Sequence, residues 1–413
     1  MTDPLLRERR EPPRRPRRLP KPPFAIWFPL AVYALIRLID VGFILAAQRH
    51  QVALPDLGKP AHPGYFAVAT NWDGEWYRTI AQNGYPSILP RQSNGAIAKN
   101  PWGFYPAYPF TVRALTWLSG LDFSLVAPLL SVVLGSAAMV VMYRLLNQTT
   151  GRLAASATVV LVCTYIAAPV TQIAYTESMA LLLTCSALLL LRHKRYAWFA
   201  VVITLLALTR PVALVLLPVV LWHGIWRYRR RDLVPFSTRD RWRVGAAGLA
   251  CLAATALWPI IAALVTGVPM AYTQTMSSWG GPGEARVLNA WTVKAWELGG
   301  VSSSAILAGA VLLAVLLTVR RGATAWGPEV RAWALAYPMF ILLTTSPGAS
   351  SPRHIFLAFP LLWPLPERPT SHSDLRLRLV AVTVLILLGL FAQWLWIDRF
   401  LVVSSTATVG LFP

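Results

Sequence analysis

Charged side chains are scarce in this chain. Only 13% of its 413 residues are Asp, Glu, Lys or Arg, whereas 56% are hydrophobic. A soluble globular domain carries about 25% charged residues, so the composition excludes an ordinary soluble domain. Apolar runs long enough to cross a bilayer recur between residues 24 and 401. We therefore predict an all-α polytopic membrane protein.

Acidic residues are the scarcer of the two charge classes. There are 17 Asp and Glu residues against 38 Lys and Arg, which gives a net charge of +21. The basic residues cluster in short segments between apolar runs, at residues 14–18, 192–195 and 227–231. That pattern is typical of cytoplasmic loops under the positive-inside rule. We expect membrane lipid as a partner and no nucleic acid.

Cysteine is also rare, and its placement excludes a disulfide framework. Cys163, Cys185 and Cys251 all lie inside apolar runs, and no two of them have metal-ligand spacing. The sequence has neither a Gly-rich phosphate loop nor a zinc-type motif. We expect no cofactor and no metal among the site residues, and a divalent metal requirement stays open. No internal repeat is evident, so an inverted-repeat transporter has no support.

Hydropathy and the positions of Arg and Lys predict the organisation of the chain. Residues 1–23 are basic and Pro-rich and are expected to form a disordered cytoplasmic tail rather than a signal peptide. Residues 24–401 are expected to form a membrane domain of about eleven spans. Residues 49–122 and 267–303 are the two long outer loops, and residues 402–413 an outer C-terminal tail. The predicted location is the cell membrane, with the N-terminus in the cytoplasm.

The first outer loop contains a polar, aromatic segment, NWDGEWYRTIAQNGYP. Asn71 is expected to cap a helix that begins at Trp72. Trp72, Trp76 and Ile80 then share one face, which suits a helix lying in the membrane interface. The following segment, FYPAYPFTVRALTWLSG, is also expected to be an interfacial helix.

The acids of this segment differ in their expected partners. Glu75 and Arg78 stand at i, i+3 and are expected to neutralise each other. Arg37 and Asp40 in the first span have the same spacing and the same expectation, with a pair that lines a cavity as the alternative. Asp73 has no obvious local partner and stands at i, i+4 from Tyr77. A plain interfacial helix with solvated acids is the alternative to a catalytic helix.

Four further polar residues are predicted on the same side of the membrane as Asp73. Glu177 begins an apolar span, Arg210 stands at a helix break in TRP, and Arg353 and His354 precede another span in SPRH. An ionisable group at membrane depth costs about 2.5–3.5 kcal/mol, so it usually has a partner or a function. The structural alternatives are a snorkelling Arg210, a helix-terminal Glu177 and a polar interfacial His354.

Five segments, in order, resemble the GPI mannosyltransferase II (PIG-V-like) family of the GT-C superfamily of membrane glycosyltransferases. They are WDGEWYRTIAQNGYP, FYPAYPFTVRAL, AYTESMALLL, LTRPVALVLLP and SSPRHIFLAFPLL, spread over residues 72–360. The resemblance implies a GT-C type bundle and a polyprenyl-phosphate-sugar donor, usually of mannose. It also implies inverting transfer on the outer face, with Asp73 as the catalytic residue. The acceptor is not carried over, because the composition resembles that of a GC-rich bacterium, which would not make GPI.

The chemistry of such a transfer agrees with these residue types. One base must accept the proton of the acceptor hydroxyl, and the leaving phosphate needs cations, whereas a glycosidase needs two paired carboxylates. We expect Asp73 to be the base and Arg210, Arg353 and His354 to be candidate phosphate ligands.

Glu177 and Tyr77 are expected to position the sugar or a glycolipid or glycan acceptor. The alternatives are transfer of another sugar, such as arabinose or glucose, and a transporter or flippase of lipid-linked sugars.

Overall fold

The computed structural model describes residues 24–53, 58–279, 290–345, 347–362 and 371–403. Their regular secondary structure is helical apart from one isolated bridge between Arg91 and Ile97, which confirms the all-α prediction. The predicted N-terminal tail, most of the predicted C-terminal tail and part of the second outer loop lie outside these residues.

Within the described residues, five helices are long and apolar enough to cross a membrane. They are α1 (Phe24–Ala47, continued by η1, Gln48–His50), α5 (Phe123–Asn147), α10 (Thr238–Thr266), α12 (Ala290–Val319) and α15 (His372–Trp396, continued by η9, Ile397–Leu401). These helices confirm a polytopic membrane protein.

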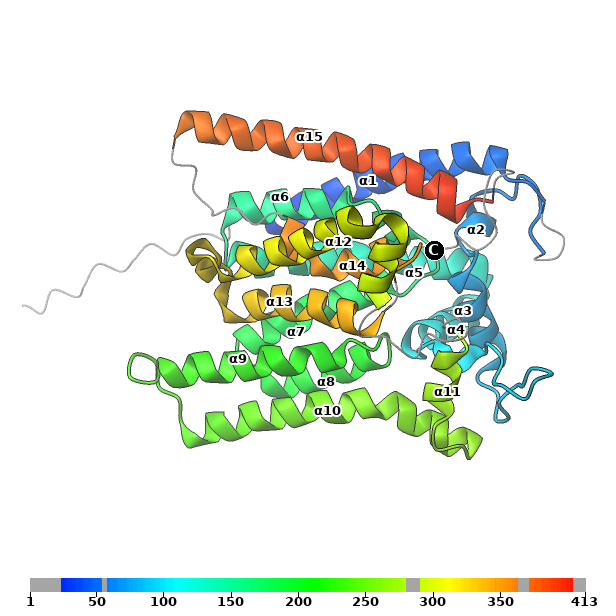
Figure 1. Ribbon diagram of the computed structural model, residues 1–413, viewed down its shortest axis with the longest axis horizontal. Helices are drawn as coiled ribbons and strands as arrows, with labels where there is room; N and C mark the ends of the chain where they lie inside the picture. Colours follow the sequence, from blue (N-terminus) through cyan, green and yellow to red (C-terminus); the bar gives the residue numbers. More distant parts are fainter. Residues whose placement is uncertain (1–23, 54–57, 280–289, 346, 363–370, 404–413) are drawn as a thin grey trace, which may run out of the picture.

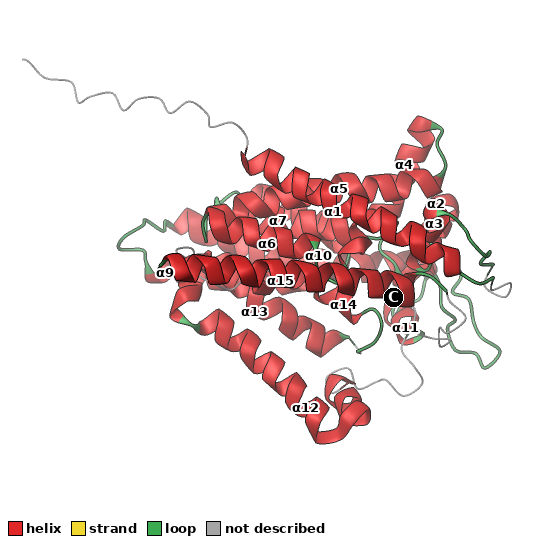
Figure 2. Ribbon diagram, turned by 90° about the horizontal axis from the view of Figure 1, so that it is seen from above, coloured by secondary structure: helices red, strands yellow, loops and turns green. Residues whose placement is uncertain are grey.

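Shorter helices complete the bundle. They are α6 (Arg152–Cys163), α7 (Glu177–Arg192), α8 (Tyr196–Ala207), α9 (Leu216–Arg229), α13 (Gly327–Thr344), α14 (Ser351–Ile355) and η8 (Phe356–Leu362). The bundle helices run side by side (Figure 1), and α12 stands at the periphery (Figure 2).

The first outer loop forms helices at one end of the bundle. These are α2 (Tyr65–Val68), α3 (Asp73–Asn83) and α4 (Ala107–Ser119), and α11 (Ala271–Ser277) from the second outer loop joins them. Figure 1 shows this group at the right-hand end, while the loop after α9 lies at the opposite end. On α4, Trp117 and Leu118 are largely exposed.

The buried pair Arg37 and Asp40 ties α1 into the bundle. Arg37 Nη2 lies 3.0 Å from Asp40 Oδ2, and both side chains are buried, which confirms the predicted neutralisation. Arg37 also donates to Thr171 Oγ1 at 3.0 Å and to the carbonyl of Cys163 at 2.7 Å. A buried charge needs partners, and those of Arg37 join α1 to the end of α6 and the segment after it.

The break at TRP divides a long apolar run into two helices, as predicted. α8 ends at Ala207, and α9 begins at Leu216 after the short helix η5 (Ala213–Val215). Pro211 lacks an amide hydrogen and disfavours helix at the residue before it. The break leaves Arg210 at a helix end, on the side of the bundle where α3 lies.

Candidate active site

Helix α3 begins at Asp73, one residue later than predicted. Its N-cap is Trp72, which has φ 59° and ψ −113°, and no side chain caps the helix. Asn71 instead accepts a hydrogen bond from Lys59 Nζ at 3.1 Å, so the predicted Asn71 cap is wrong. The indole of Trp72 donates to the carbonyl of Leu401 at 3.0 Å. This tertiary contact supports a left-handed backbone that a non-glycine residue rarely adopts.

The tryptophan face of α3 packs partly inside the protein. Ile80 is fully buried, and Trp76 stacks on Phe104 with ring centroids 5.6 Å apart. Trp279 contacts both rings edge-on, at 5.2 Å. Rings from two later segments thus cover part of this face, while Trp72 and Trp76 stay partly exposed, and its placement in the membrane interface stays a prediction.

The predicted pair of Glu75 and Arg78 does not form. Glu75 pairs with Lys59, which the chain brings over from the segment before α2. Arg78 Nη2 donates to Thr70 Oγ1 at 3.1 Å. A favourable i, i+3 spacing contributes only about 0.2–0.5 kcal/mol, so tertiary partners outweigh it easily.

Four of the predicted site residues meet in one cluster at this end of the bundle. Arg353 Nη1 lies 2.5 Å from Asp73 Oδ2 and 3.5 Å from Glu177 Oε1. Arg210 Nη1 lies 2.6 Å from the same Glu177 oxygen. Two carboxylates and two guanidinium groups thus alternate, and their formal charges cancel.

The cluster is graded in exposure. The Glu177 side chain is 0% exposed, whereas Asp73 is 17% exposed and Arg210 15% exposed. Asp73 and Arg210 are therefore partly accessible, whereas Glu177 is not. Glu177 is placed to hold the two arginines rather than to touch a ligand.

A glycine lets α3 approach the start of α7. A Cβ on Gly74 would lie 3.3 Å from the Cβ of Ala174, which is tighter than most such contacts. The amide of Ala174 donates to the carbonyl of Ala69 at 2.7 Å. This close approach brings Asp73 of the first outer loop beside Glu177, at the start of α7.

Tyr77 and His354 flank the cluster and stay neutral. Tyr77 lies one turn after Asp73, and its hydroxyl donates to Thr176 Oγ1 at 3.4 Å. Burial raises the pKa of the Tyr77 phenol above its ordinary value, and the Asp73 carboxylate raises it further. Burial lowers the pKa of His354 well below 6.5, and the charges of Arg353 and Arg210 lower it further.

Two buried nitrogen atoms at the cluster are left unpaired within the described part of the chain. Arg353 Nε and His354 Nδ1 are buried, and neither has a hydrogen-bond partner among the described residues. Buried polar nitrogens are rarely left unpaired. Guanidinium and imidazole nitrogens pair well with phosphate oxygens, so the donor set fits a phosphate group.

Two aromatic residues of the site were not predicted. The guanidinium carbon of Arg353 lies 5.1 Å from the ring centre of Tyr175, in a cation–π contact. The hydroxyl of Tyr337 donates to the carbonyl of His354 at 2.5 Å. Tyr175 stands two residues before Glu177, so its place in the site could have been predicted from that neighbour. Tyr337 lies in an apolar helix, and no neighbouring residue in the sequence indicates a role in the site.

Within the described residues, no group of three or more His, Cys, Asp or Glu side chains could hold a metal ion. The three cysteines are free and buried. The cluster itself offers the two carboxylates of Asp73 and Glu177, and both already contact arginine.

The fold and the cluster define an all-α membrane protein with an acid–arginine site at one end of its bundle. No family model matches the chain, and no curated protein matches it. Solved structures of the oligosaccharyltransferase AglB of the archaeon Archaeoglobus fulgidus are similar. The complex with an inhibitory peptide and a dolichol-phosphate is 13% identical, with a TM-score of 0.49, and the match covers 91% of this chain and 56% of that chain.

A second structure, the Archaeoglobus fulgidus oligosaccharyltransferase with zinc and sulfate, gives a similar result. It is 15% identical with a TM-score of 0.46, and the match covers 89% of this chain and 52% of that chain. The present chain thus spans about half the length of these proteins. At these scores the likeness carries no argument about function, so the function is argued from the site alone.

Proposed function

We propose that the protein transfers a sugar, mannose, from a polyprenyl-phosphate donor to a hydroxyl group of a lipid-linked or cell-envelope glycan. The observation that carries the proposal is the contact between Asp73 and Arg353, whose positions are 280 residues apart in the sequence. It places a partly exposed carboxylate beside a guanidinium group at one end of a membrane bundle, and a second guanidinium group joins the cluster through Glu177. A base and a phosphate-binding group are the two parts that such a transfer needs.

The donor phosphate is proposed to bind at Arg353 and Arg210. Arg353 Nε and His354 Nδ1 have no hydrogen-bond partner among the described residues and are available to its oxygens. The guanidinium of Arg353 offers five N–H donors, so it can bind a phosphate and stay near Glu177. The apolar surfaces of the bundle keep the polyprenyl tail in the bilayer.

Phosphate binding is proposed to free the base. Asp73 Oδ2 lies 2.5 Å from Arg353 Nη1, so a guanidinium group engages the carboxylate. A bound phosphate competes for this guanidinium and draws it away from the carboxylate. Asp73 then accepts the proton of the acceptor hydroxyl as the oxygen attacks the anomeric carbon. The bond from that carbon to the phosphate oxygen breaks with inversion, and the lipid phosphate leaves on the arginines.

The rings beside α3 are proposed to hold the sugar or the acceptor. Trp76, Phe104 and Trp279 pack against one another with centroids 5.2–5.6 Å apart, and Trp76 is three residues after Asp73. Pockets that bind organic ligands are lined mainly by apolar and aromatic side chains with a few polar groups. We place the site on the extracytoplasmic face of the cell membrane.

The test is transfer of labelled mannose from lipid-phosphate-mannose in membranes that contain the protein. Asp73→Asn should abolish transfer, because an amide accepts no proton, and a positioned base contributes about 10²–10⁴ in rate. Glu75→Gln is the matched control, since Glu75 lies on the same first turn of α3 and its side chain is 52% exposed. Retained transfer in Asp73→Asn at a normal protein level would refute the assignment of the base.

The same assay separates the proposal from its rivals. Donors that carry arabinose or glucose, offered in parallel, identify the sugar. A transporter or flippase of lipid-linked sugars would move labelled donor across vesicles without forming a glycosidic product. Arg353→Ala should raise the donor concentration that is needed for half-maximal transfer. An unchanged dependence on donor concentration would count against the phosphate site.

A further inference from the structure

A basic cavity lies at the end of the bundle away from Asp73. α7 links the two ends: Glu177 begins it in the acid–arginine cluster, and Arg192 ends it at the cavity. At 1.5 Å per residue, the two positions are about 22 Å apart. The cavity has a volume of about 510 Å³ and is therefore distinct from the proposed active site.

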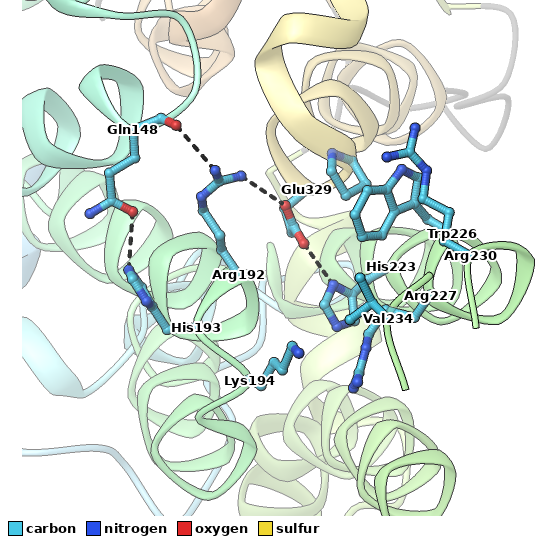
Figure 3. Close-up of a pocket in the computed structure, with 11 residues that line it drawn as sticks. Gln148, Arg192, His193, Lys194, His223, Trp226, Arg227, Arg230, Val234 and Glu329 are labelled. Atoms are coloured by element: carbon cyan, nitrogen blue, oxygen red, sulfur yellow. Dashed lines mark hydrogen bonds and ion pairs between the residues drawn. The ribbon is translucent and has the colours of Figure 1, made fainter. Parts of the chain in front are cut away.

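The charge of this cavity is strongly positive. Arg192, Lys194, Arg227 and Arg230 line it, together with a single acid, Glu329. Figure 3 shows the residues of the α7 end and those of α9 on opposite sides of the same opening. A hollow with four cations and one acid favours an anionic ligand.

The acid of the cavity and two of its four cations already have charged partners, since Arg227 pairs with Asp240 at 3.1 Å. The other two cations have no carboxylate partner among the described residues, although Arg230 stacks over the ring of Trp226. Glu329 Oε1 lies 2.6 Å from His223 Nδ1, and its other oxygen lies 4.0 Å from Arg192 Nη1. No carboxylate of the described residues lies within ion-pair distance of Lys194 or Arg230. Both side chains are exposed, so an anion can reach them.

A second, mainly apolar groove lies further along α9, toward the middle of the bundle. It lies between α9 and α13, which pack side by side, and has a volume of about 500 Å³. On α9, Trp226 lines the cavity and Trp222, one turn earlier, lines the groove. On α13, Pro328 lines the cavity and Ala332, one turn later, lines the groove. Residues four apart share a helix face, so the groove follows the cavity along the same faces of α9 and α13.

This combination has the shape of a lipid site. We infer that the cavity binds the head group of an anionic glycerophospholipid, such as phosphatidylglycerol, and that the groove holds one of its acyl chains. The basic cavity suits the phosphate of the lipid head group, because basic pockets between membrane helices bind anionic head groups. The groove favours a lipid over a soluble phosphate as the ligand, because the groove's far end is lined by apolar, partly exposed side chains such as Met339 and Leu343.

The test is a titration of the purified full chain in detergent, with bound lipid counted by native mass spectrometry. Phosphatidylglycerol should bind more tightly than phosphatidylcholine with the same acyl chains. The double variant Lys194→Gln, Arg230→Gln should weaken phosphatidylglycerol binding on the order of 30-fold, because each basic residue contributes about 1 kcal/mol of attraction to an anionic lipid. The double variant Arg195→Gln, Arg229→Gln is the control. It removes the same charge from neighbouring positions that do not line the cavity, so it should bind phosphatidylglycerol as tightly as the wild type does.

A second pair of variants tests the groove without any change of charge. Ala336→Trp fills the groove between α9 and α13 and should weaken phosphatidylglycerol binding, whereas Ala256→Trp, on an exposed position of α10, should not. Equal weakening by the two charge variants would overturn the proposal, since it would mean general surface attraction. Competition by soluble glycerol phosphate at the same concentration as the lipid would overturn it as well, because the ligand would then be a free phosphate.

Discussion

Glu177 is the residue on which the acid–arginine cluster depends. Its Oε1 atom lies 2.6 Å from Arg210 Nη1 and 3.5 Å from Arg353 Nη1. Its side chain is 0% exposed, so water cannot replace it. Removing one partner of a buried ion pair leaves an uncompensated buried charge. Glu177 is therefore a positioning residue, which keeps the arginines where the proposed donor phosphate binds.

Glu177→Gln should destabilise the protein by about 3–5 kcal/mol, because two guanidinium groups lose their shared carboxylate. Glu297→Gln is the control, since Glu297 pairs with Lys294 at 3.0 Å with both side chains about half exposed. An exposed pair contributes about 0–1 kcal/mol, so the control should melt near the wild-type temperature. Thermal unfolding in detergent gives the melting temperature of each variant. Equal melting temperatures for the two variants would contradict the role of Glu177.

The neutral state of His354 gives a prediction about pH. Burial and the two arginines hold the pKa of His354 well below 6.5. Below about pH 6.5 the unfolded chain binds a proton at this histidine that the folded chain does not, so stability falls as the pH falls. The loss is at most about 1.4 kcal/mol per pH unit. The melting temperature of His354→Gln should therefore fall less between pH 7.5 and pH 5.5 than the melting temperature of the wild type does.

The control for this pH effect is His372→Gln. His372 is exposed at the start of α15, so this variant should keep the wild-type dependence on pH. If His354→Gln shows the same dependence as His372→Gln, the neutral state assigned to His354 is wrong.

The members of the cluster could be predicted from the sequence, but their pairing could not. Asp73, Glu177, Arg210 and Arg353 are identifiable because charges are rare in an apolar chain and costly at membrane depth. The contact of Asp73 with Arg353 spans 280 positions, and no local spacing encodes it. The partner of Glu75 was mispredicted for the same reason, since Lys59 reaches it through the fold.

At the scale of elements, the packing of α3 on the start of α7 decides where Asp73 stands. The first turn of α3 carries Gly74, whose missing side chain allows the contact with Ala174. A side chain there must push the turn away, and overpacking of this kind costs about 1–3 kcal/mol. Such a displacement moves the carboxylate from the arginines, although no charged group has changed.

Gly74→Leu should therefore lower sugar transfer by at least tenfold, since a misplacement of about 1 Å can cost 10²-fold in rate. Gly42→Leu is the matched control, because Gly42 lies inside helix α1 and a Cβ there meets nothing within 4 Å. The assay is initial rate in membranes at equal protein level. Equal rates for the two variants would mean that the approach of α3 to Ala174 does not position Asp73.

Helices were predicted well where apolar runs and breakers mark them, and poorly where tertiary contacts decide. The division at Pro211 and the start of α7 at Glu177 follow from local rules. The start of α3 does not, because Trp72 adopts a left-handed backbone supported by its bond to Leu401. A capping residue such as Asn71 is a weaker determinant than such a contact.

At the scale of the whole molecule, the two ends of the bundle differ in charge and in contents. One end holds the neutral acid–arginine cluster and the helices of the first outer loop, and the other holds the basic cavity. Basic loops stay on the cytoplasmic side of membranes. We therefore expect the cavity to face the cytoplasm and Asp73 to face outward, where a lipid-linked sugar and an envelope acceptor can meet.

Single cysteines at the two ends test this orientation. Ser93 is exposed at the tip of the loop between α3 and α4, and Arg195 is exposed in the loop between α7 and α8. Cys163, Cys185 and Cys251 are buried, so a membrane-impermeant maleimide should leave them unlabelled. Ser93→Cys should react in intact cells, and Arg195→Cys only after permeabilisation. Labelling of Arg195→Cys in intact cells would mean that the protein has the opposite orientation and that Asp73 acts on the cytoplasmic face.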